Sequence, residues 1–296
     1  MTTPVPRSDG AGAPYGNAAG TAPPQSLTVD LDDPGALDAG VAGGKMATLA
    51  RLRQAGFSVP DGFVLTTAAF ALSAAARGAA GPGPVASPTG IPVAVETQAV
   101  AGYLRLARRL GTPEPSVAVR SSANTEDTAG RSAAGLYRTE LHVTGEATLG
   151  AAVARCWAAA FSPAAFAYWG SEAFGTRMAL GVTRMVRPRV SGVVFSVDTV
   201  TPAPDCALIE AVPGLGDALV DGVTIPEHHT VERVRGTVRD SLPGDGGTLL
   251  SPPSLRAVLR LALSIEEVLG CPADIEWALE EDTDEPVVLQ ARPITV

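Results

Sequence analysis

The last stretch of the chain limits its fold most tightly, because it is predicted to form two strands folded back on each other. Residues 274–280, Asp-Ile-Glu-Trp-Ala-Leu-Glu, alternate polar and apolar side chains in the manner of a half-buried strand. Residues 286–295 form a second extended run, and the acidic segment 281–285 supplies the turn between them. The pattern therefore predicts an antiparallel hairpin with one apolar face and one polar face.

The polar face of this hairpin carries an acid, an amide and a guanidinium. Trp277 is expected in the core, so Glu276 lies on the other face. If the hairpin pivots near Thr283, Glu276 falls opposite Gln290, and Arg292 lies two residues further along the same face. A carboxylate beside an amide oxygen suits Mg²⁺, and a guanidinium binds phosphate oxygens in pairs. The alternative is a surface hairpin with a solvated polar face.

Composition excludes some classes of function. The chain has 296 residues, of which 46% are hydrophobic and 18% are charged, which is enough for a core divided between two lobes. A net charge of -9 without any basic run argues against a nucleic-acid partner. The three cysteines, Cys156, Cys206 and Cys271, have no paired spacing for zinc or redox chemistry. A reducing cytoplasm is the simplest setting for such a chain.

Neither the N-terminal segment nor the most apolar later region predicts a membrane protein. Residues 1–25 are rich in Gly, Pro, Ala, Ser and Thr, lack the apolar stretch of a secretory signal, and are predicted to be a disordered tail. The most apolar later region, residues 151–169, is broken by Arg155 and Pro163. This region is therefore expected to be a pair of packed helices rather than a membrane span.

From Ser26 onward, helical and extended patterns alternate, which predicts a mixed α/β fold. Helices are expected over residues 43–55, 67–77, 94–110 and 254–269. Strands are expected near residues 63–65, 117–120, 137–143, 180–185, 192–197 and 207–211. Residues 78–90, which are full of Gly and Pro, are expected to form a linker or surface loop.

Three glycine-bearing segments are candidates for a phosphate-binding loop. Gly130-Arg-Ser-Ala-Ala-Gly135 joins two predicted strands and is small enough to close over a polyphosphate, although ordinary hairpin connections look the same. The segment 40–46 has the wrong glycine spacing for a P-loop, with Met46 where Ser or Thr is needed. The segment 214–219 lacks the third glycine of a dinucleotide-binding turn.

A set of strings in fixed order resembles one known family. The strings are Gly43-Gly-Lys-Met-Ala-Thr-Leu-Ala, residues 55–67, Val119-Arg-Ser-Ser-Ala, Glu126-Asp, Gly135, Val190-Ser-Gly-Val-Val-Phe, Ile209-Glu-Ala with Gly214-Leu-Gly, Asp274-Ile-Glu-Trp-Ala and Leu289-Gln-Ala-Arg-Pro-Ile. Together they resemble the ATP-binding domain of phosphoenolpyruvate synthase, pyruvate phosphate dikinase and rifampicin phosphotransferase. The resemblance covers essentially everything after the tail.

The resemblance implies an ATP-grasp-like fold, with an N-terminal lobe over residues 26–179, a C-terminal lobe over residues 180–296, and ATP between them. It implies that Lys45, Arg120 and Arg292 are the catalytic cations on the phosphates, beneath Gly135 and Thr139. It implies that Glu276 and Gln290 hold Mg²⁺. It implies that Thr183 and Met185 contact the adenine base of ATP. Relatives usually carry Gln in place of Thr183. The threonine side chain can still form a hydrogen bond but is shorter.

Other interpretations of three of these residues stay open. Lys45 stands at a predicted helix start, where a cation is disfavoured unless an anion is near, so phosphate competes with simple solvation. Arg120 ends an apolar strand, and an ion pair with Glu126 or Asp127 is the rival to phosphate. Glu210 is assigned to the ribose or the metal, and a surface ion pair explains it equally well.

The resemblance also bears on the reaction. In full-length relatives a phosphorylatable histidine domain and an acceptor domain follow, and none of His142, His228 and His229 lies in the Gly- and Ser-rich turn expected around such a histidine. Three functions follow. The chain is a dikinase-type phosphotransferase subunit that releases AMP and acts on a separate histidine-domain protein, a self-sufficient kinase for a small-molecule acceptor, or a non-catalytic nucleotide-binding module.

Overall fold

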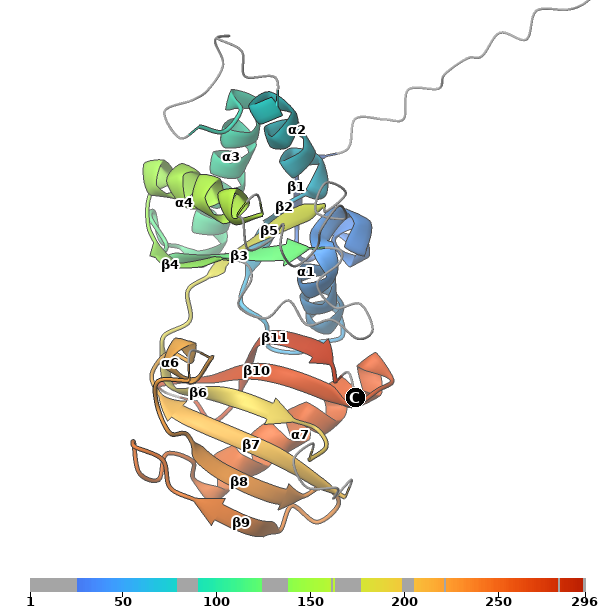
Figure 1. The fold of residues 1–296 in the computed structure, drawn as a ribbon, viewed down its shortest axis with the longest axis vertical. Coiled ribbons are helices and arrows are strands. Elements are labelled where there is room, and N and C mark those ends of the chain that lie inside the picture. The colour runs from blue at the N-terminus through green and yellow to red at the C-terminus, as the bar shows by residue number, and fades with distance from the viewer. Residues whose placement is uncertain are drawn as a thin grey trace, which may run out of the picture.

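The chain folds into two lobes, each built on its own antiparallel sheet and stacked along the long axis of the molecule (Figure 1). The computed structural model describes residues 26–78, 90–123, 138–160, 162, 177–198, 205–220, 222–281 and 283–294. The tail and most of the 78–90 linker predicted above lie outside these residues. The mixed α/β class with two lobes is confirmed.

The N-terminal lobe holds a five-stranded sheet in the order β1-β2-β5-β3-β4. Its strands are β1 (Thr28–Asp30), β2 (Gly62–Leu65), β3 (Val117–Ala123), β4 (Thr139–Val143) and β5 (Met178–Arg184). Its helices are η1 (Pro34–Leu37), α1 (Ala39–Gln54), α2 (Thr67–Gly78), α3 (Val93–Leu110) and α4 (Glu146–Ala159).

The two faces of this sheet bury different helices. On one face, Tyr103 of α3 and Trp157 of α4 are buried against alternate residues of β3 and β5. On the other face, α1 comes so close that a Cβ atom added to Gly181 of β5 would lie 2.2 Å from Met46 Sδ. Residues of β3 and β5 that do not point at α3 and α4 therefore lie on the α1 side.

The C-terminal lobe holds a six-stranded sheet in the order β11-β10-β6-β7-β8-β9. Its strands are β6 (Pro188–Phe195), β7 (Cys206–Pro213), β8 (Glu227–Glu232), β9 (Val238–Leu242), β10 (Ala273–Glu280) and β11 (Val287–Pro293). Its helices are α6 (Asp217–Val220) and α7 (Pro252–Leu269).

Helix α7 covers one face of this sheet (Figure 1). It begins where the Ser251 side chain accepts a hydrogen bond from the Ser254 amide, and it ends at Gly270, whose φ of 75° gives the left-handed cap. Ile275 and Trp277 of β10 are fully buried in the core that α7 completes, as the alternation predicted for Trp277. Within the described residues no helix combines the length and the apolar character of a membrane span.

The sequence placed the lobe boundary between Ala179 and Leu180, and the structure moves it. Strand β5 runs through that position and belongs to the N-terminal sheet, between β2 and β3. The chain crosses to the other sheet between Arg184 and Pro188, which begins β6. Only Met185, Val186 and Arg187 lie between β5 and β6, so no long linker marks the crossing in the sequence.

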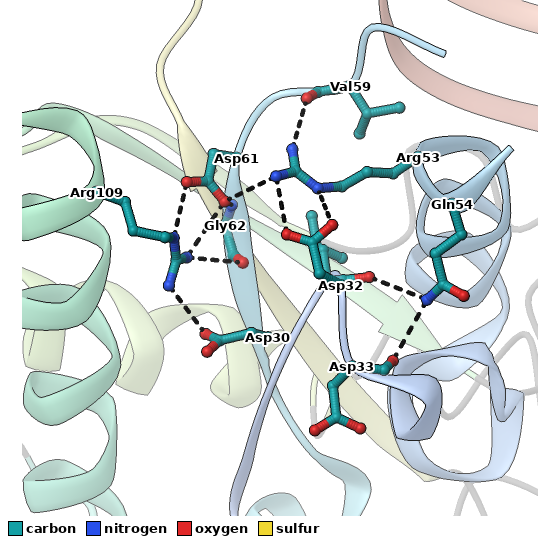
Figure 2. Close-up of polar contacts among 10 residues, drawn as sticks. Asp30, Asp32, Asp33, Arg53, Gln54, Val59, Asp61, Gly62 and Arg109 are labelled. Carbon is teal, nitrogen blue, oxygen red and sulfur yellow. Dashed lines mark hydrogen bonds and ion pairs between the residues drawn. The ribbon is translucent and has the colours of Figure 1, made fainter. Parts of the chain in front are cut away.

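A network of charged side chains fixes the connection between α1 and β2 (Figure 2). Arg53 holds both carboxylate oxygens of Asp32, at 2.6 and 2.9 Å, and lies 3.4 Å from Asp61. Arg109 of α3 donates to the other oxygen of Asp61 at 2.8 Å and lies 3.6 Å from Asp30. The network therefore ties α1, β1, α3 and the start of β2 to one another.

This connection also contacts the second lobe. The amide of Val288 in β11 donates to the carbonyl of Ser58 at 2.8 Å. One continuous apolar cluster contains Leu49 and Leu52 of α1 together with Val288 of β11 and residues of α7. The two sheets are thus held in a fixed relation on the α1 side of the molecule.

Candidate functional site

The polar face of the C-terminal hairpin lies on the side of the sheet away from α7. Strand β10 pairs with β11 so that Glu276 lies opposite Gln290 and Asp274 lies opposite Arg292. Glu276 stands between Ile275 and Trp277, and their burial against α7 fixes its side chain on the other face. The register predicted from the sequence for Glu276, Gln290 and Arg292 is confirmed.

Asp274 joins this group although it was not among the predicted site residues. Its Oδ2 atom accepts from Arg292 Nε at 2.8 Å and lies 2.7 Å from Arg292 Nη2. Only 11% of the Asp274 side chain is exposed, so the pair is well shielded from water. Its position two residues before Glu276 was the available signal, because side chains two apart on a strand share a face.

An apolar cluster lies on the same two strands, at the end next to the crossing between the lobes. Its buried members are Val186 of the crossing, Ala278 of β10 and Val287 of β11, with half-buried Leu289 packed against them. Ala278 is two residues from Glu276 and therefore shares its face. The face is thus apolar near the crossing, acid and amide in the middle, and an acid paired with a guanidinium at the far end.

Glu210 lies in the same row of the sheet as Glu276. Val193 of β6 pairs with Glu276 on one side and with Glu210 of β7 on the other, so all three share a face. His228 of β8 lies opposite Glu210, with 3.7 Å between its Nδ1 atom and Glu210 Oε1. Glu210 therefore has a histidine neighbour on the same face as the metal-binding candidates.

The N-terminal lobe contributes its own row on the α1 side of its sheet. Arg120 of β3 lies opposite Thr139 of β4 and opposite Gly181 of β5, against which α1 packs. Thr183 is two residues further along β5, on the same face, and is buried beside Gly62. The structure therefore brings Arg120, Thr139 and Thr183 to one face of the sheet.

Lys45 is brought to this face by a break in α1. Gly43 has φ 71° and ψ 164°, so the helix restarts after it and Lys45 lies in the first turn of the second part. A Cβ atom added to Gly43 would lie 1.9 Å from the carbonyl oxygen of Ser122, and the Met46 amide donates to Ser122 Oγ at 3.1 Å. The helix start that carries Lys45 is therefore docked two residues from Arg120 on β3.

The two rows meet in one ion pair, which we call the cleft pair. Arg120 Nη1 lies 3.2 Å from Glu276 Oε2, and the two side chains are 24% and 28% exposed. Glu126 and Asp127, the rival ion-pair partners for Arg120 in the sequence, lie outside the described residues, as does Gly135. The contact places the phosphate-binding candidates of one lobe against the metal-binding candidates of the other.

A second ion pair, which we call the hinge pair, joins the lobes where the chain crosses between them. Arg184 Nη1 and Nη2 lie 2.8 and 3.0 Å from Glu280 Oε1 and Oε2. The hydrogen bonds from Arg184 lower the pKa of Glu280 below its ordinary range, and the amide of Arg187 lowers it further. Met185, expected at the base, donates its amide to the Ser116 carbonyl at 2.9 Å and is itself buried.

All three histidines lie in strands, His142 in β4 and both His228 and His229 in β8. His142 is exposed in β4 with φ 55°. His229 is buried with its Nε2 atom 3.0 Å from Glu227 Oε1. The other oxygen of Glu227, Oε2, accepts from the amides of Leu249 and Leu250. Glu227 therefore anchors the segment before α7 to β8.

The fold and these rows define a two-lobed α/β domain with polar side chains of both lobes facing each other. The chain belongs to the family described as the pyruvate phosphate dikinase AMP/ATP-binding domain, whose match covers residues 86–245 and 248–296. The family predicted from the ordered strings is therefore confirmed.

Individual relatives agree with this family. The chain is 31% identical over 306 residues to the probable phosphoenolpyruvate synthase of Methanothermobacter thermautotrophicus, covering 87% of this chain and 44% of the relative. It is 35% identical over 317 residues to a rifampicin phosphotransferase of Streptomyces sp, covering 91% and 36%. The chain thus spans less than half the length of either relative.

Similarity to solved structures is slight. The D-alanine-D-alanine ligase of Coxiella burnetii matches with a TM-score of 0.37 and 14% identity, over 84% of this chain and 46% of that one.

Proposed function

We propose that this chain binds Mg·ATP between its lobes and is the nucleotide-binding part of an ATP-dependent phosphotransferase. The order of side chains along β10 and β11 carries the proposal. From the crossing outward the order is the apolar cluster, then Glu276 with Gln290, then Asp274 with Arg292. This order matches the order of groups in a nucleotide, which are an apolar base, a metal-bound polyphosphate and its terminal charge.

The oxygen ligands of the hairpin fit Mg²⁺. Mg²⁺ in nucleotide sites keeps several waters and is bound by one or two carboxylates and by the phosphates themselves. Glu276 and Gln290 supply a carboxylate and an amide oxygen as direct cross-strand neighbours. When bound, Mg²⁺ neutralises charge that develops on the phosphate oxygens. Among the described residues no group of three or more His, Cys, Asp or Glu is arranged to hold a metal alone, which agrees with a site completed by phosphate.

The chain's cations bind and orient the phosphates. Lys45 and Arg120 come from the N-terminal lobe and Arg292 from the C-terminal lobe, so a polyphosphate between the lobes meets positive charge from both sides. Thr139 lies opposite Arg120 and supplies a hydroxyl beside it, with Gly135 expected on the preceding loop. Phosphoryl transfer depends mainly on such positioning and charge stabilisation.

The base is assigned to the end of the cleft at the crossing, and the ribose to the row of Glu276. Thr183 and Met185 flank Arg184 at the crossing, next to the apolar cluster. Glu210 shares the row of Glu276 and, in this proposal, accepts a hydrogen bond from a ribose hydroxyl. An apolar floor with a few placed polar groups is the usual composition of a nucleotide pocket.

The acceptor in this proposal is a histidine on a separate domain or polypeptide, and AMP is released. This assignment of the acceptor and of the product follows the resemblance to the family. The rival is a small-molecule acceptor that enters the cleft directly.

The test is incubation of the purified chain with Mg·ATP, with and without cell extract, followed by chromatography of the nucleotides. AMP formed only with extract is the expected result. ADP would favour an ordinary kinase, and ATP unchanged in both conditions would favour the non-catalytic module. If calorimetry detects no binding of Mg·ATP, the proposed function is rejected.

A further inference from the structure

Glu280 stands where the chain crosses between the lobes, and it uses both carboxylate oxygens there. One oxygen accepts from Arg184 Nη1 at 2.8 Å and also from the Arg187 amide at 3.3 Å. The other accepts from Arg184 Nη2 at 3.0 Å. A single carboxylate thus binds the first and last residues of the segment 184–187.

The position of Glu280 in the sheet makes these bonds possible. The register of β10 against β6 shifts between Leu279 and Glu280, where Glu280 comes opposite Pro188. Proline has no amide to donate, so the pairing that would continue the ladder is not available at this point. Instead, the carboxylate of Glu280 accepts hydrogen bonds from Arg184 and from the Arg187 amide of the crossing segment.

The segment that Glu280 holds carries residues of the proposed base pocket. Met185 lies within it, Val186 belongs to the apolar cluster, and Thr183 precedes it directly. Val186 packs with Ala278, which is two residues before Glu280 on the same strand. The segment 184–187 forms one wall of the proposed base pocket, and β10 forms its floor. Glu280 therefore fixes the distance between this wall and this floor.

From this arrangement we infer that Glu280 is a positioning residue for the nucleotide base, acting through Arg184 and Arg187 on the segment that carries Met185 and Val186. The inference rests on the proposed function, because it assumes that the base binds at this end of the cleft. Glu280 makes its contacts with the protein and is assigned none with the ligand. The lowered pKa of Glu280 agrees with a carboxylate that stays charged in this place.

The experiment compares a ligand that has a base with one that lacks it. Binding of Mg·ATP and of Mg·tripolyphosphate to the whole chain is measured by titration calorimetry, so no acceptor is needed. Glu280→Gln keeps the size of the side chain and removes the charge that binds Arg184. We expect about fivefold weaker binding of Mg·ATP and unchanged binding of Mg·tripolyphosphate, since only the base contacts are disturbed.

The matched control is Glu266→Gln. Glu266 of α7 also pairs with an arginine, Arg233, at 2.6 Å, and its exposure is close to that of Glu280, but it lies on the face of the sheet away from the cleft. Both affinities are expected to stay at their wild-type values in this control. Arg184→Lys serves as a second variant in case Glu280→Gln does not fold. It keeps the positive charge but loses the bidentate hydrogen bonds to Glu280, and we expect the same selective loss of affinity for Mg·ATP.

The outcomes separate the two proposals. If Glu280→Gln lowers the affinity for both ligands equally, the inference is overturned. The hinge pair would then fix the geometry of the whole cleft and not only that of the base pocket. Unchanged Mg·ATP binding would overturn it as well. If the wild-type chain binds neither ligand, the proposed function itself fails, and this result is visible before any variant is made.

Discussion

The cleft pair and the hinge pair both join the lobes, but they differ in geometry and in what surrounds them. Arg120 contacts Glu276 through one nitrogen at 3.2 Å, whereas Arg184 grips both oxygens of Glu280 at 2.8 and 3.0 Å. Glu280 also accepts a backbone hydrogen bond from Arg187, while Glu276 lies beside Gln290, an uncharged residue with no comparable contact to it among those described.

The difference indicates two kinds of contact between the lobes. Both members of the cleft pair are assigned to ligands, Arg120 to phosphate and Glu276 to metal, so each is expected to change partner when Mg·ATP enters. Neither member of the hinge pair is assigned to a ligand, so that pair is expected to persist. The cleft pair satisfies two charges at the proposed ligand site, and the hinge pair fixes the geometry around which that site is built.

The largest effect is expected from Glu276→Ala. The variant removes the carboxylate from the proposed metal site, and we expect Mg²⁺-dependent binding of ATP to weaken by about 100-fold, in line with losses seen when a metal site is disrupted. Calorimetry with and without Mg²⁺ measures the effect. Glu266→Ala, on the other side of the sheet, is the control. Full Mg²⁺-dependent affinity, or full ATP turnover, in Glu276→Ala would remove Glu276 from the metal site.

A smaller but still large effect is expected from Arg120→Gln. Loss of a charged hydrogen-bond donor to phosphate should weaken binding of Mg·ATP by about tenfold or more. Stability without nucleotide should fall by no more than about 1 kcal/mol, since the cleft pair is partly exposed. Urea unfolding and calorimetry on one preparation give both numbers. A large loss of stability with unchanged affinity would instead make the cleft pair a structural bond.

Asp274→Asn tests whether Arg292 needs its partner. Arg292 should keep its charge but lose part of its orientation, and we expect affinity for Mg·ATP to fall by about threefold to tenfold. Asp284→Asn is the matched control, because Asp284 also pairs with an arginine, Arg189, at 2.7 Å but lies in the turn after β10. An equal loss of affinity in both variants would show that the effect is not specific to Arg292.

The hairpin half of the site was open to prediction from the sequence because its physics is local. Alternation of period two fixes which residues share a face, and a short acidic turn fixes the register. Glu276 and Gln290 are only 14 residues apart in the chain, and they lie opposite each other as expected. The same rule places Asp274 on the face of Glu276, two residues away along β10.

The contacts between the lobes were not open to prediction in this way. Arg120 and Glu276 are 156 positions apart, and nothing in either local sequence selects the other as partner. The sequence predicted phosphate for Arg120, with the nearby acids Glu126 and Asp127 as the rival, and did not point to Glu276. Glu280 was missed because a register shift precedes it, and the strict alternation that located Glu276 does not extend across such a shift.

Strand β9 of the C-terminal sheet was also missed, for a related reason. Strand β9 is exposed along its whole length and contains Arg239 and Asp240, so it has no apolar alternation to detect. It forms because the edge of β8 offers unpaired backbone groups. Such pairing is decided by the neighbouring strand and not by side-chain pattern.

The smallest expected effect concerns the hinge pair and its dependence on pH. The pKa of Glu280 in the folded protein lies below its ordinary value of 4.5, so its contribution to stability is present above that value and is lost as pH falls through the folded pKa. The free energy of unfolding of the wild type should exceed that of Glu280→Gln by about 1 kcal/mol or less at pH 7, since the pair is partly exposed. The difference should shrink steadily as the pH is lowered below 4.5, and urea unfolding of both proteins across this range measures it. A difference that stays constant, or grows in acid, would mean that the Glu280 carboxylate is not held in its charged form by Arg184, and the contrast between a persistent hinge pair and an exchangeable cleft pair would lose its basis.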